Sequence, residues 1–337
     1  MPPERKVYFN GDYVLESEAR VSIFDSALMF GDMLFEMTRT FNNDPFRLPA
    51  HLERLYRGLK VMEIDAGLTI DQMEEATIRT LEANIQCFPD DIDCQIMHNV
   101  SRGPLPLYES VFPEGIGPTV TISCWPLTTH LAAHAEIYET GVHAVVTPQR
   151  SVPARLIDPK IKNRSRIYYQ VANQQAVRVD PDAWALLTDD NGYITEGTGS
   201  NFFIVREGEL FSAEPHNILR GVTRGALIDL ATRLGLKVHT VDIEPYDAMN
   251  ADEAFFTATS FSIMPCTRFD GRPISDAQPG PITRRLITAW SEWVGVDIVA
   301  QAKQYAEDVK DKDRNAKKVK KPKNISKDAS NATTEGN

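Results

Sequence analysis

The eleven residues from Tyr193 to Phe203, Tyr-Ile-Thr-Glu-Gly-Thr-Gly-Ser-Asn-Phe-Phe, constrain the fold more than any other part of the chain. They follow Asn191-Gly192, a pair that favours a tight hairpin because both central residues of a type I′ turn need a positive φ. The run therefore predicts a strand, a glycine-punctuated loop and a second strand. Glu196 lies among small residues, where a backbone can approach a ligand closely. From the residues alone, Glu196 is either a solvated carboxylate or the partner of a cation or protonated ring nitrogen.

Charge and composition argue against several classes of partner. The 337 residues carry a formal net charge of −11, and residues 301–337 alone hold ten Lys/Arg against six Asp/Glu. Residues 1–300 are therefore strongly acidic, which makes nucleic acid an unexpected partner. The four cysteines show no metal-ligand spacing, so we expect no metal. No apolar run approaches ~18 residues and the N-terminus has no apolar signal segment, so we expect no membrane span and a cytoplasmic location.

The periodic patterns predict two domains and a tail. We expect a small N-terminal α/β domain over residues 1–126, an interdomain linker over 127–136 and a larger C-terminal domain over 137–300. Apolar residues at helical spacing predict helices over residues 51–62, 71–84, 165–177, 224–234 and 282–293. Residues 305–337 lack the apolar content that would offset the entropy of ordering, so we expect a disordered basic tail.

The run from Tyr193 to Phe203 resembles the cofactor-binding signature of the fold-type IV pyridoxal phosphate enzymes, which include branched-chain aminotransferases, D-amino acid transaminases and aminodeoxychorismate lyase. Further stretches resemble the family's other motifs in the same order: Phe24 to Glu36, His51-Leu52-Glu53-Arg54-Leu55, Asp158-Pro159-Lys160-Ile161-Lys162-Asn163, Gly221-Val222-Thr223 and Thr257-Ala258-Thr259-Ser260. The resemblance implies an α+β, two-domain fold-type IV enzyme (D-amino acid transaminase-like) with pyridoxal 5′-phosphate at the domain interface.

The resemblance also implies roles for individual residues. Two lysines, Lys160 and Lys162, stand in the third motif, and local chemistry does not choose between them; the family pattern selects Lys162 as the catalytic lysine. Glu196 is expected to contact the pyridine nitrogen of the cofactor, and Arg54 its phosphate. The full set of cofactor-binding residues implied by the resemblance is Arg54, Lys162, Glu196, Gly221, Val222, Thr223, Ala258 and Thr259. A non-catalytic binding protein would be expected to have lost Lys162 or Glu196, and both are present.

The substrate side resembles no single branch throughout. Residues Phe35 to Arg39 resemble the corresponding segment of branched-chain aminotransferases. Ile167, however, stands where those enzymes have a tyrosine. The Pro-Arg-x-His carboxylate trap of bacterial D-amino acid transaminases is missing, because the stretch that stands in its place is Pro106-Leu107-Tyr108-Glu109. The substrate-binding residues implied by the resemblance are Phe30, Phe35, Met37, Arg39 and Ser260.

The reaction we expect is amino transfer from an apolar, branched-chain L-amino acid to 2-oxoglutarate, in a homodimer or higher homo-oligomer. The substrates would then be an amino acid and a 2-oxo acid. A D-amino acid or (R)-amine transaminase and a lyase of the aminodeoxychorismate type remain alternatives, because the cofactor motifs are common to all of these branches.

Overall fold

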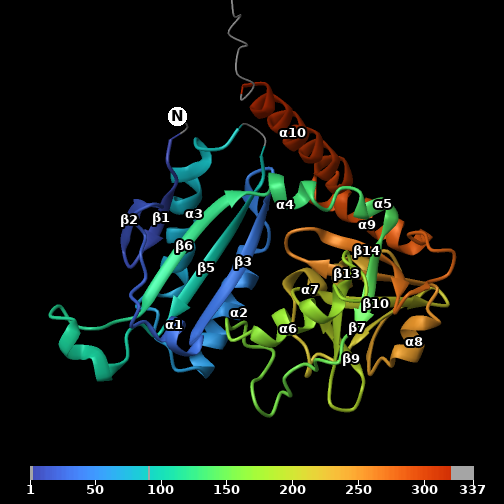
Figure 1. Cartoon of the computed structure of the whole chain (residues 1–337), viewed down its shortest axis with the longest axis horizontal. Helices are drawn as coiled ribbons and strands as arrows, with labels where there is room; N and C mark the ends of the chain where they lie inside the picture. The colour runs from blue at the N-terminus through green and yellow to red at the C-terminus, as the bar shows by residue number, and fades with distance from the viewer. Residues whose placement is uncertain (1–2, 90–91, 320–337) are drawn as a thin grey trace, which may run out of the picture.

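Two β-sheets organise the molecule, each at the centre of one lobe (Figure 1). The computed structural model describes residues 3–89 and 92–319. The two lobes lie side by side, and segments from both lobes reach the boundary between them. The architecture mixes helices and strands in both lobes, as the α+β assignment requires.

The first lobe holds a six-stranded sheet in the order β2-β1-β6-β5-β3-β4, in which every neighbouring pair is antiparallel. Helices α2 and α3 pack on it and bury an apolar stripe that includes Leu52, Leu55 and Met73. Its elements are β1 (Lys6–Phe9), β2 (Asp12–Leu15), α1 (Ser26–Phe30), β3 (Met33–Phe41), β4 (Asp44–Pro45), α2 (Leu48–Val61), α3 (Ile70–Ile85), β5 (Cys94–Ser101), the 3-10 helix η1 (Pro106–Val111) and β6 (Thr119–Pro126).

The second lobe holds a nine-stranded sheet that closes on itself. Its path runs β12-β11-β10-β13-β14-β7-β8-β9, with β15 on β14, and β9 then pairs with β10, so that the strands from β10 to β9 form a ring. The closing register joins Glu196 to Asn201, on the two strands predicted around the Gly197-Thr198-Gly199 loop. The remaining elements are α4 (Thr128–Ala132), α5 (Ile137–Thr140), β7 (Val142–Val146), α6 (Ile167–Ala176), β8 (Trp184–Thr188), β9 (Ile194–Gly197), β10 (Asn201–Arg206), β11 (Glu209–Ala213), α7 (Val222–Arg233), β12 (Val238–Val241), α8 (Pro245–Met249), β13 (Glu253–Ala258), β14 (Ser262–Phe269), β15 (Arg272–Pro273), α9 (Pro281–Val294) and α10 (Ile298–Val319).

The segment 127–136, expected to be an interdomain linker, joins β6 of the first lobe to the second lobe and packs as part of the latter. It contains α4, and Leu127, Leu131 and Ala135 are buried in the core of the second lobe. The physical reason is its composition, because apolar residues four apart on a short helix give it a face that packs.

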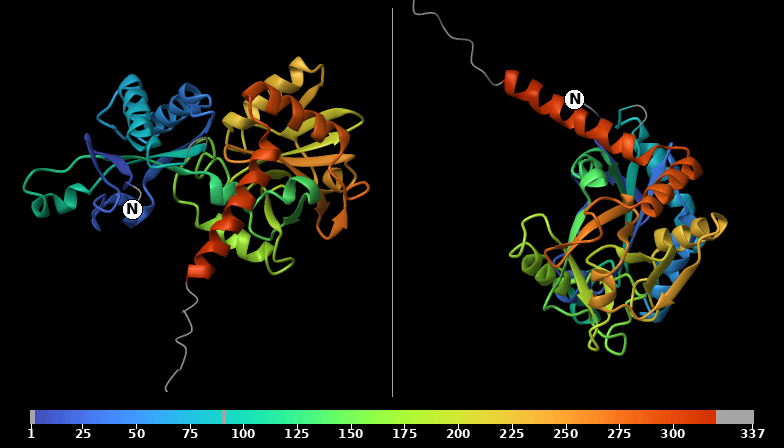
Figure 2. Two further views of the ribbon diagram at one scale, coloured as in Figure 1. Left: turned by 90° about the horizontal axis from the view of Figure 1, so that it is seen from above. Right: turned by 90° about the vertical axis from the view of Figure 1, so that its right-hand side faces the viewer.

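The prediction of a disordered tail from residue 305 is wrong for the residues up to 319. Helix α10 covers Ile298–Val319 (Figure 2), and its Ala302 and Tyr305 are buried in the core of the second lobe. Two apolar residues on one face provide the packing that the average composition of the tail conceals. Residues 320–337, where the rest of that prediction falls, lie outside the described residues. In the described part of the chain, no helix is long and apolar enough to cross a membrane.

Candidate active site

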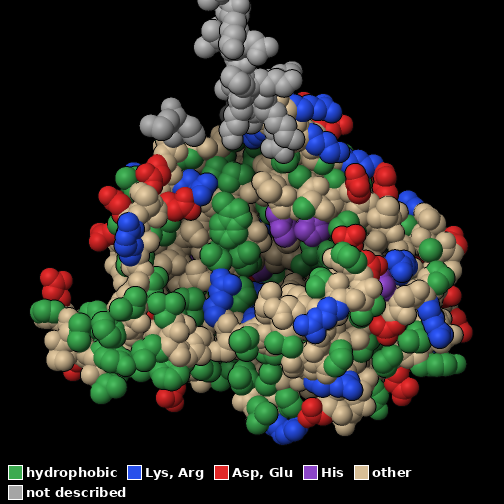
Figure 3. All heavy atoms as spheres, in the orientation of Figure 1, with side chains coloured by type: hydrophobic (Ala, Val, Ile, Leu, Met, Phe, Trp, Pro, Cys, Tyr) green, Lys and Arg blue, Asp and Glu red, His purple; other side chains and the backbone are tan. Residues whose placement is uncertain are grey.

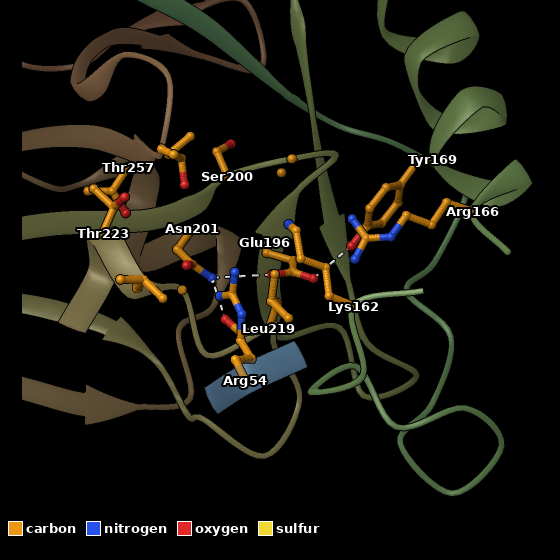
Figure 4. Close-up of a pocket in the computed structure, with 16 residues that line it drawn as sticks. Arg54, Lys162, Arg166, Tyr169, Glu196, Ser200, Asn201, Leu219, Thr223 and Thr257 are labelled. Carbon is orange, nitrogen blue, oxygen red and sulfur yellow. Dashed lines mark hydrogen bonds between the residues drawn. The ribbon is translucent and has the colours of Figure 1, made fainter. Parts of the chain in front are cut away.

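A cavity opens where the strand ring closes, on the side that faces the first lobe (Figure 4). It collects side chains from the loop before α6, the β9–β10 junction, the start of α7 and the end of β13, together with one residue of α2. The residues that line it are Arg54, Lys162, Arg166, Tyr169, Glu196, Gly197, Gly199, Ser200, Asn201, Leu219, Gly221, Val222, Thr223, Thr257, Ala258 and Thr259. All eight residues expected to bind the cofactor are among them.

Glu196 lies at the centre of this cavity as a buried carboxylate with three donors. Its Oε1 accepts from the Tyr169 hydroxyl at 2.7 Å, and its Oε2 accepts from Asn201 Nδ2 at 3.2 Å and from the Leu219 backbone N–H at 3.1 Å. Burial raises the pKa of Glu196, whereas the donors and the charges of Arg166 and Lys162 oppose the rise. A cation placed against this carboxylate would be held strongly, since little water screens the pair.

Tyr169 was missed by the sequence reasoning, which considered only Ile167 at the tyrosine position of the family. Ile167 is 81% exposed at the first residue of α6 and contributes nothing to the cavity. Tyr169, two residues further along the helix, is buried and donates to Glu196 (Figure 4). Burial raises its pKa well above the ordinary value, so the phenol keeps its proton. The signal that could have revealed it is the Tyr168-Tyr169 pair on the helix that follows Lys162.

Lys162 projects into the cavity from a loop that both lobes hold. Its carbonyl accepts from the Phe35 N–H at 3.0 Å, and its Nζ lies 4.7 Å from the centre of the Phe35 ring. Burial lowers the pKa of Lys162 to about 7, helped by the positive charges of Arg166 and Arg54. Lys160, the other lysine of the motif, lies outside the cavity and pairs with Asp158 at 2.9 Å. The geometry therefore distinguishes two lysines that local chemistry left equivalent.

The start of α7 forms an anion cradle. A helix leaves its first N–H groups without intrahelical partners, and Val222 and Thr223 bring theirs to the cavity wall. Gly221 precedes them, and a Cβ there would lie 2.1 Å from Asn201 Oδ1, so the close approach requires glycine. The Thr257 hydroxyl is buried beside the cavity with no hydrogen-bond partner among the described residues. Free backbone donors, an unpartnered hydroxyl and Arg54 together fit a phosphate group.

Arg54 reaches the cavity from α2 and is held by a buried carboxylate. Its Nε and Nη2 donate to the two oxygens of Glu36 at 2.6 and 2.7 Å, and its Nη1 donates to the Arg220 carbonyl at 2.9 Å. His51 completes the group at 2.8 Å from Glu36. Burial alone would raise the pKa of Glu36, but Arg54 and His51 hold it well below its usual range. A phosphate would therefore meet a guanidinium whose orientation is already fixed.

The five residues expected to bind substrate do not join this cavity in the described structure. Phe30 is 64% exposed at the end of α1. Phe35 is buried beside Lys162, and Met37 lies further along the same strand. Arg39 is almost completely buried and bonds to protein groups, and Ser260 lines a neighbouring cavity with His130. The substrate roles of these residues remain predictions.

Arg166 is a second residue that sequence reasoning did not identify. Its guanidinium carbon lies 5.1 Å from the centre of the Tyr169 ring and 5.0 Å from that of Phe35. It brings a positive charge to the Lys162 side of the cavity, which is why it contributes to the low pKa of that lysine. Its position four residues after Lys162 offers no local signal of a site role, since an arginine in a loop is solvated by default.

The chain is similar to known proteins over most of its length. The Amino-transferase class IV family matches residues 33–269. A putative branched-chain-amino-acid aminotransferase of Methanocaldococcus jannaschii is 35% identical over 283 residues, which cover 83% of this chain and 93% of that protein. A D-alanine aminotransferase of Bacillus licheniformis is 28% identical, over 84% of this chain and 95% of its own length.

Solved structures show the same architecture. A branched-chain amino acid aminotransferase of T.th., solved with pyridoxamine 5′-phosphate, has a TM-score of 0.77 and 27% identity, over 88% of this chain and 96% of its own. The corresponding Escherichia coli enzyme has a TM-score of 0.75 and 27% identity, over 86% of this chain and 94% of its own. The expected α+β, fold-type IV architecture is confirmed.

The first prediction concerns the proton on Lys162. Only a neutral amine attacks an aldehyde, so cofactor-free protein should capture added pyridoxal phosphate with a rate that rises with pH through a midpoint near the pKa of about 7. Arg166→Gln removes a neighbouring positive charge and should move the midpoint to higher pH. Absorbance of the bound cofactor measures the rate, and borohydride reduction with peptide mapping identifies the modified residue.

Two variants control this experiment. Lys162→Ala should capture no cofactor, and Lys160→Ala should leave the midpoint unchanged because Lys160 lies outside the cavity. An Arg166→Gln midpoint equal to or below that of the unmodified protein would contradict the electrostatic account.

Proposed function

The chain belongs to the class IV aminotransferase family, and we propose that it transfers the amino group of an apolar, branched-chain L-amino acid to 2-oxoglutarate. Its cofactor is pyridoxal 5′-phosphate. The observation that carries the proposal is a single cavity into which both lobes bring all eight residues expected to hold this cofactor. The similarity to several branched-chain aminotransferases supports the choice of amino donor.

The residues of the cavity divide into those that hold the cofactor and those that act on the reacting atoms. When bound, pyridoxal 5′-phosphate supplies an electron sink that stabilises negative charge at the substrate Cα. The start of α7 and Arg54 would bind its phosphate, and Glu196 would pair with its ring nitrogen. Because Tyr169, Asn201 and Leu219 all donate to Glu196, the carboxylate is fixed in place before the cofactor arrives.

Lys162 would both anchor the cofactor and move a proton. A lysine with its ordinary pKa would be an ammonium at neutral pH and could not accept a proton. The lowered pKa of about 7 leaves a large share of Lys162 as the neutral amine. That amine could take a proton from the substrate Cα and deliver it to C4′ of the cofactor. Arg166 and Arg54 therefore contribute to the reaction through their effect on this pKa.

The donor preference is the part of the proposal that needs its own test. We expect L-leucine, L-isoleucine and L-valine to convert the bound cofactor to its amine form, which shifts its absorbance, with 2-oxoglutarate reversing the shift. Because one methylene in an apolar pocket changes binding by only ~1–3 kcal/mol, the three donors should differ by no more than about a hundredfold in rate.

The same half-reaction assay separates the alternatives. D-Alanine or an (R)-amine that reacts rapidly while L-leucine is inert would replace the L-specific assignment by a D-amino acid or (R)-amine transaminase. Pyruvate released from aminodeoxychorismate would assign the protein to the lyase branch.

A pair of variants tests the division of labour in the cavity. Glu196→Gln should retain the cofactor but lose at least ~100-fold in turnover, because the amide lacks the negative charge that keeps the ring nitrogen protonated. Arg54→Ala should instead release cofactor, and its activity should recover as pyridoxal phosphate is added. Cofactor content from absorbance, measured beside kcat, distinguishes the two losses, and identical behaviour of both variants would contradict the assignment.

We further propose that the enzyme is a homodimer or higher homo-oligomer. Figure 3 shows apolar side chains gathered over the segment that projects from the first lobe and along the adjoining face. Large apolar residues are exposed on α1, on η1 and at the start of α6 and include Leu28, Phe30, Leu107, Val111 and Ile167. Contacts of Phe24 with Tyr108, and of Ser165 with the Phe30 carbonyl, bring their segments together. An apolar surface of this kind favours association, and a second copy would cover Phe30.

Light scattering after size exclusion tests the oligomer. Leu107→Asp, at a position 79% exposed on η1, should shift the protein toward the monomer because a carboxylate would be buried at the contact. Tyr246→Asp, at a position 71% exposed on α8, should leave the assembly unchanged. A monomeric parent protein at micromolar concentration, or equal masses for parent and Leu107→Asp, would contradict the proposal.

We place this enzyme in the cytoplasm and expect no nucleic acid partner. The four cysteines are free, and three of them are buried, as suits a reducing compartment. The acidic net charge of the chain supports the absence of nucleic acid binding.

A further inference from the structure

Helix α10 inserts a polar side chain into a buried ion pair of the first lobe. Arg39, on β3, lies 3.6 Å from Asp93, which precedes β5, and both are almost completely buried. Gln301 of α10 accepts from Arg39 Nη2 at 2.8 Å and donates from Nε2 to Asp93 Oδ2 at 2.7 Å. The Tyr305 hydroxyl, one turn further along α10, accepts from the Asp93 N–H at 3.0 Å. The helix thus completes the hydrogen bonding of both charges.

The other side of the Arg39 guanidinium reaches the substrate side of the site. Its Nη1 donates to the carbonyl of Ser260 at 2.8 Å, although the two residues belong to different lobes. Ser260 follows Ala258 and Thr259, which line the cofactor cavity, and Ser260 itself lines the neighbouring cavity with Phe261. The chain of contacts from α10 through Arg39 therefore ends on the loop that separates the two cavities.

The same loop has two further supports, and α10 lies against one of them. Ser260 Oγ lies 2.8 Å from His130 Nε2 on α4, and the Phe261 carbonyl accepts from the Tyr138 hydroxyl at 2.6 Å. Figure 1 and Figure 2 show α10 running across α4. Ala302 and Tyr305 of α10 share a buried core with Leu131 of α4. α10 thereby fixes the loop from two directions, through Arg39 and through α4.

We propose that α10 is a positioning element of the substrate site, in which Gln301, acting through Arg39 and Asp93, fixes the loop from Thr259 to Phe261 in its binding conformation. Gln301 touches no reacting atom and lies outside residues 33–269, which match the aminotransferase family. In this proposal Arg39 acts as a positioning residue. The inference rests on the proposed aminotransferase function and adds a residue that controls substrate affinity.

Because Arg39 and Asp93 are buried, loss of their hydrogen bonds to Gln301 costs free energy. Gln301 satisfies one N–H of a buried guanidinium and one oxygen of a buried carboxylate, so an apolar side chain at this position removes a partner from each. Arg39 must then turn toward Asp93 or admit water, and either movement weakens its bond to the Ser260 carbonyl. When the loop is in its binding conformation only part of the time, the apparent affinity for substrate falls by that fraction.

Steady-state kinetics of the full chain with the cofactor bound tests the inference. Gln301→Leu keeps the approximate volume, and we expect KM for the amino donor to rise about tenfold, as for a hydrogen bond to a charged group, while kcat changes less than about threefold. The absorbance of the bound cofactor should not change, because Lys162 and Glu196 lie outside the network. Gln304→Leu is the matched control, since Gln304 is exposed on the same helix and bonds to Asp308.

A rescue experiment separates positioning from general stabilisation. Asp93→Asn combined with Gln301→Glu keeps one carboxylate and one amide beside Arg39 and reverses the direction of their mutual hydrogen bond. The double variant should return KM to within about threefold of the parent value, whereas Asp93→Asn alone should not, because a reversed pair restores the partners of Arg39. Thermal unfolding of each variant records any loss of stability separately.

The outcomes distinguish the inference from the proposed function. A parent protein that is inactive with every donor would overturn the proposed function. An active parent whose Gln301→Leu variant has an unchanged KM, with only a lower melting temperature, would show that α10 merely stabilises the fold. A double variant whose KM is no lower than that of Asp93→Asn alone would also overturn the inference. This comparison does not require that Gln301→Leu can be purified.

Discussion

Closure of the strand ring between β9 and β10 is the constraint on which the rest of the active site depends. The closing pair, Glu196 and Asn201, lies across a tight loop whose Gly197 has no room for a side chain beside Ser200 and Phe256. Closure therefore buries the Glu196 carboxylate, which apolar packing alone would not favour. Asn201 then links the strand to Glu196 and, through the Leu219 carbonyl, to the segment that begins α7. Asn201 consequently fixes the Glu196 carboxylate relative to the segment that leads into α7.

The electrostatics of the site follow a second rule, that buried charges are oriented by partners of their own. Glu36 orients Arg54, three donors orient Glu196, and Asp93 orients Arg39. Lys162 differs, because its burial and the cations Arg166 and Arg54 outweigh the nearby carboxylates, and its pKa falls as a result. A buried ion pair is weak evidence of stability, but it defines geometry closely. Arg54, Glu196 and Arg39 are thus held by partners, whereas Lys162 forms no salt bridge among the described residues.

The sequence predicted those helices and strands whose pattern lies within a single segment of the chain. The expected helix over residues 71–84 is α3, and that over 282–293 is α9, because each carries its apolar stripe within the segment. The two strands around the Gly197 loop were predicted for the same reason. Tyr169 was not predicted, since its partner Glu196 is 27 residues away. The role of α10 was hidden because Gln301 lies 262 residues from Arg39 and 208 from Asp93.

This difference has a physical origin in how the two halves of the site are built. The candidate cofactor cavity is lined by short loop segments and by the start of α7, where close backbone approach leaves a recognisable pattern of glycine and small residues. The proposed substrate side depends instead on side chains from outside the second lobe's sheet, including Arg39 and the Gln301 that bonds to it. Such supports can be replaced without altering any motif. Because Gln301 lies 262 residues from Arg39, no local motif records this contact, and the sequence therefore predicts the cofactor more sharply than the amino donor.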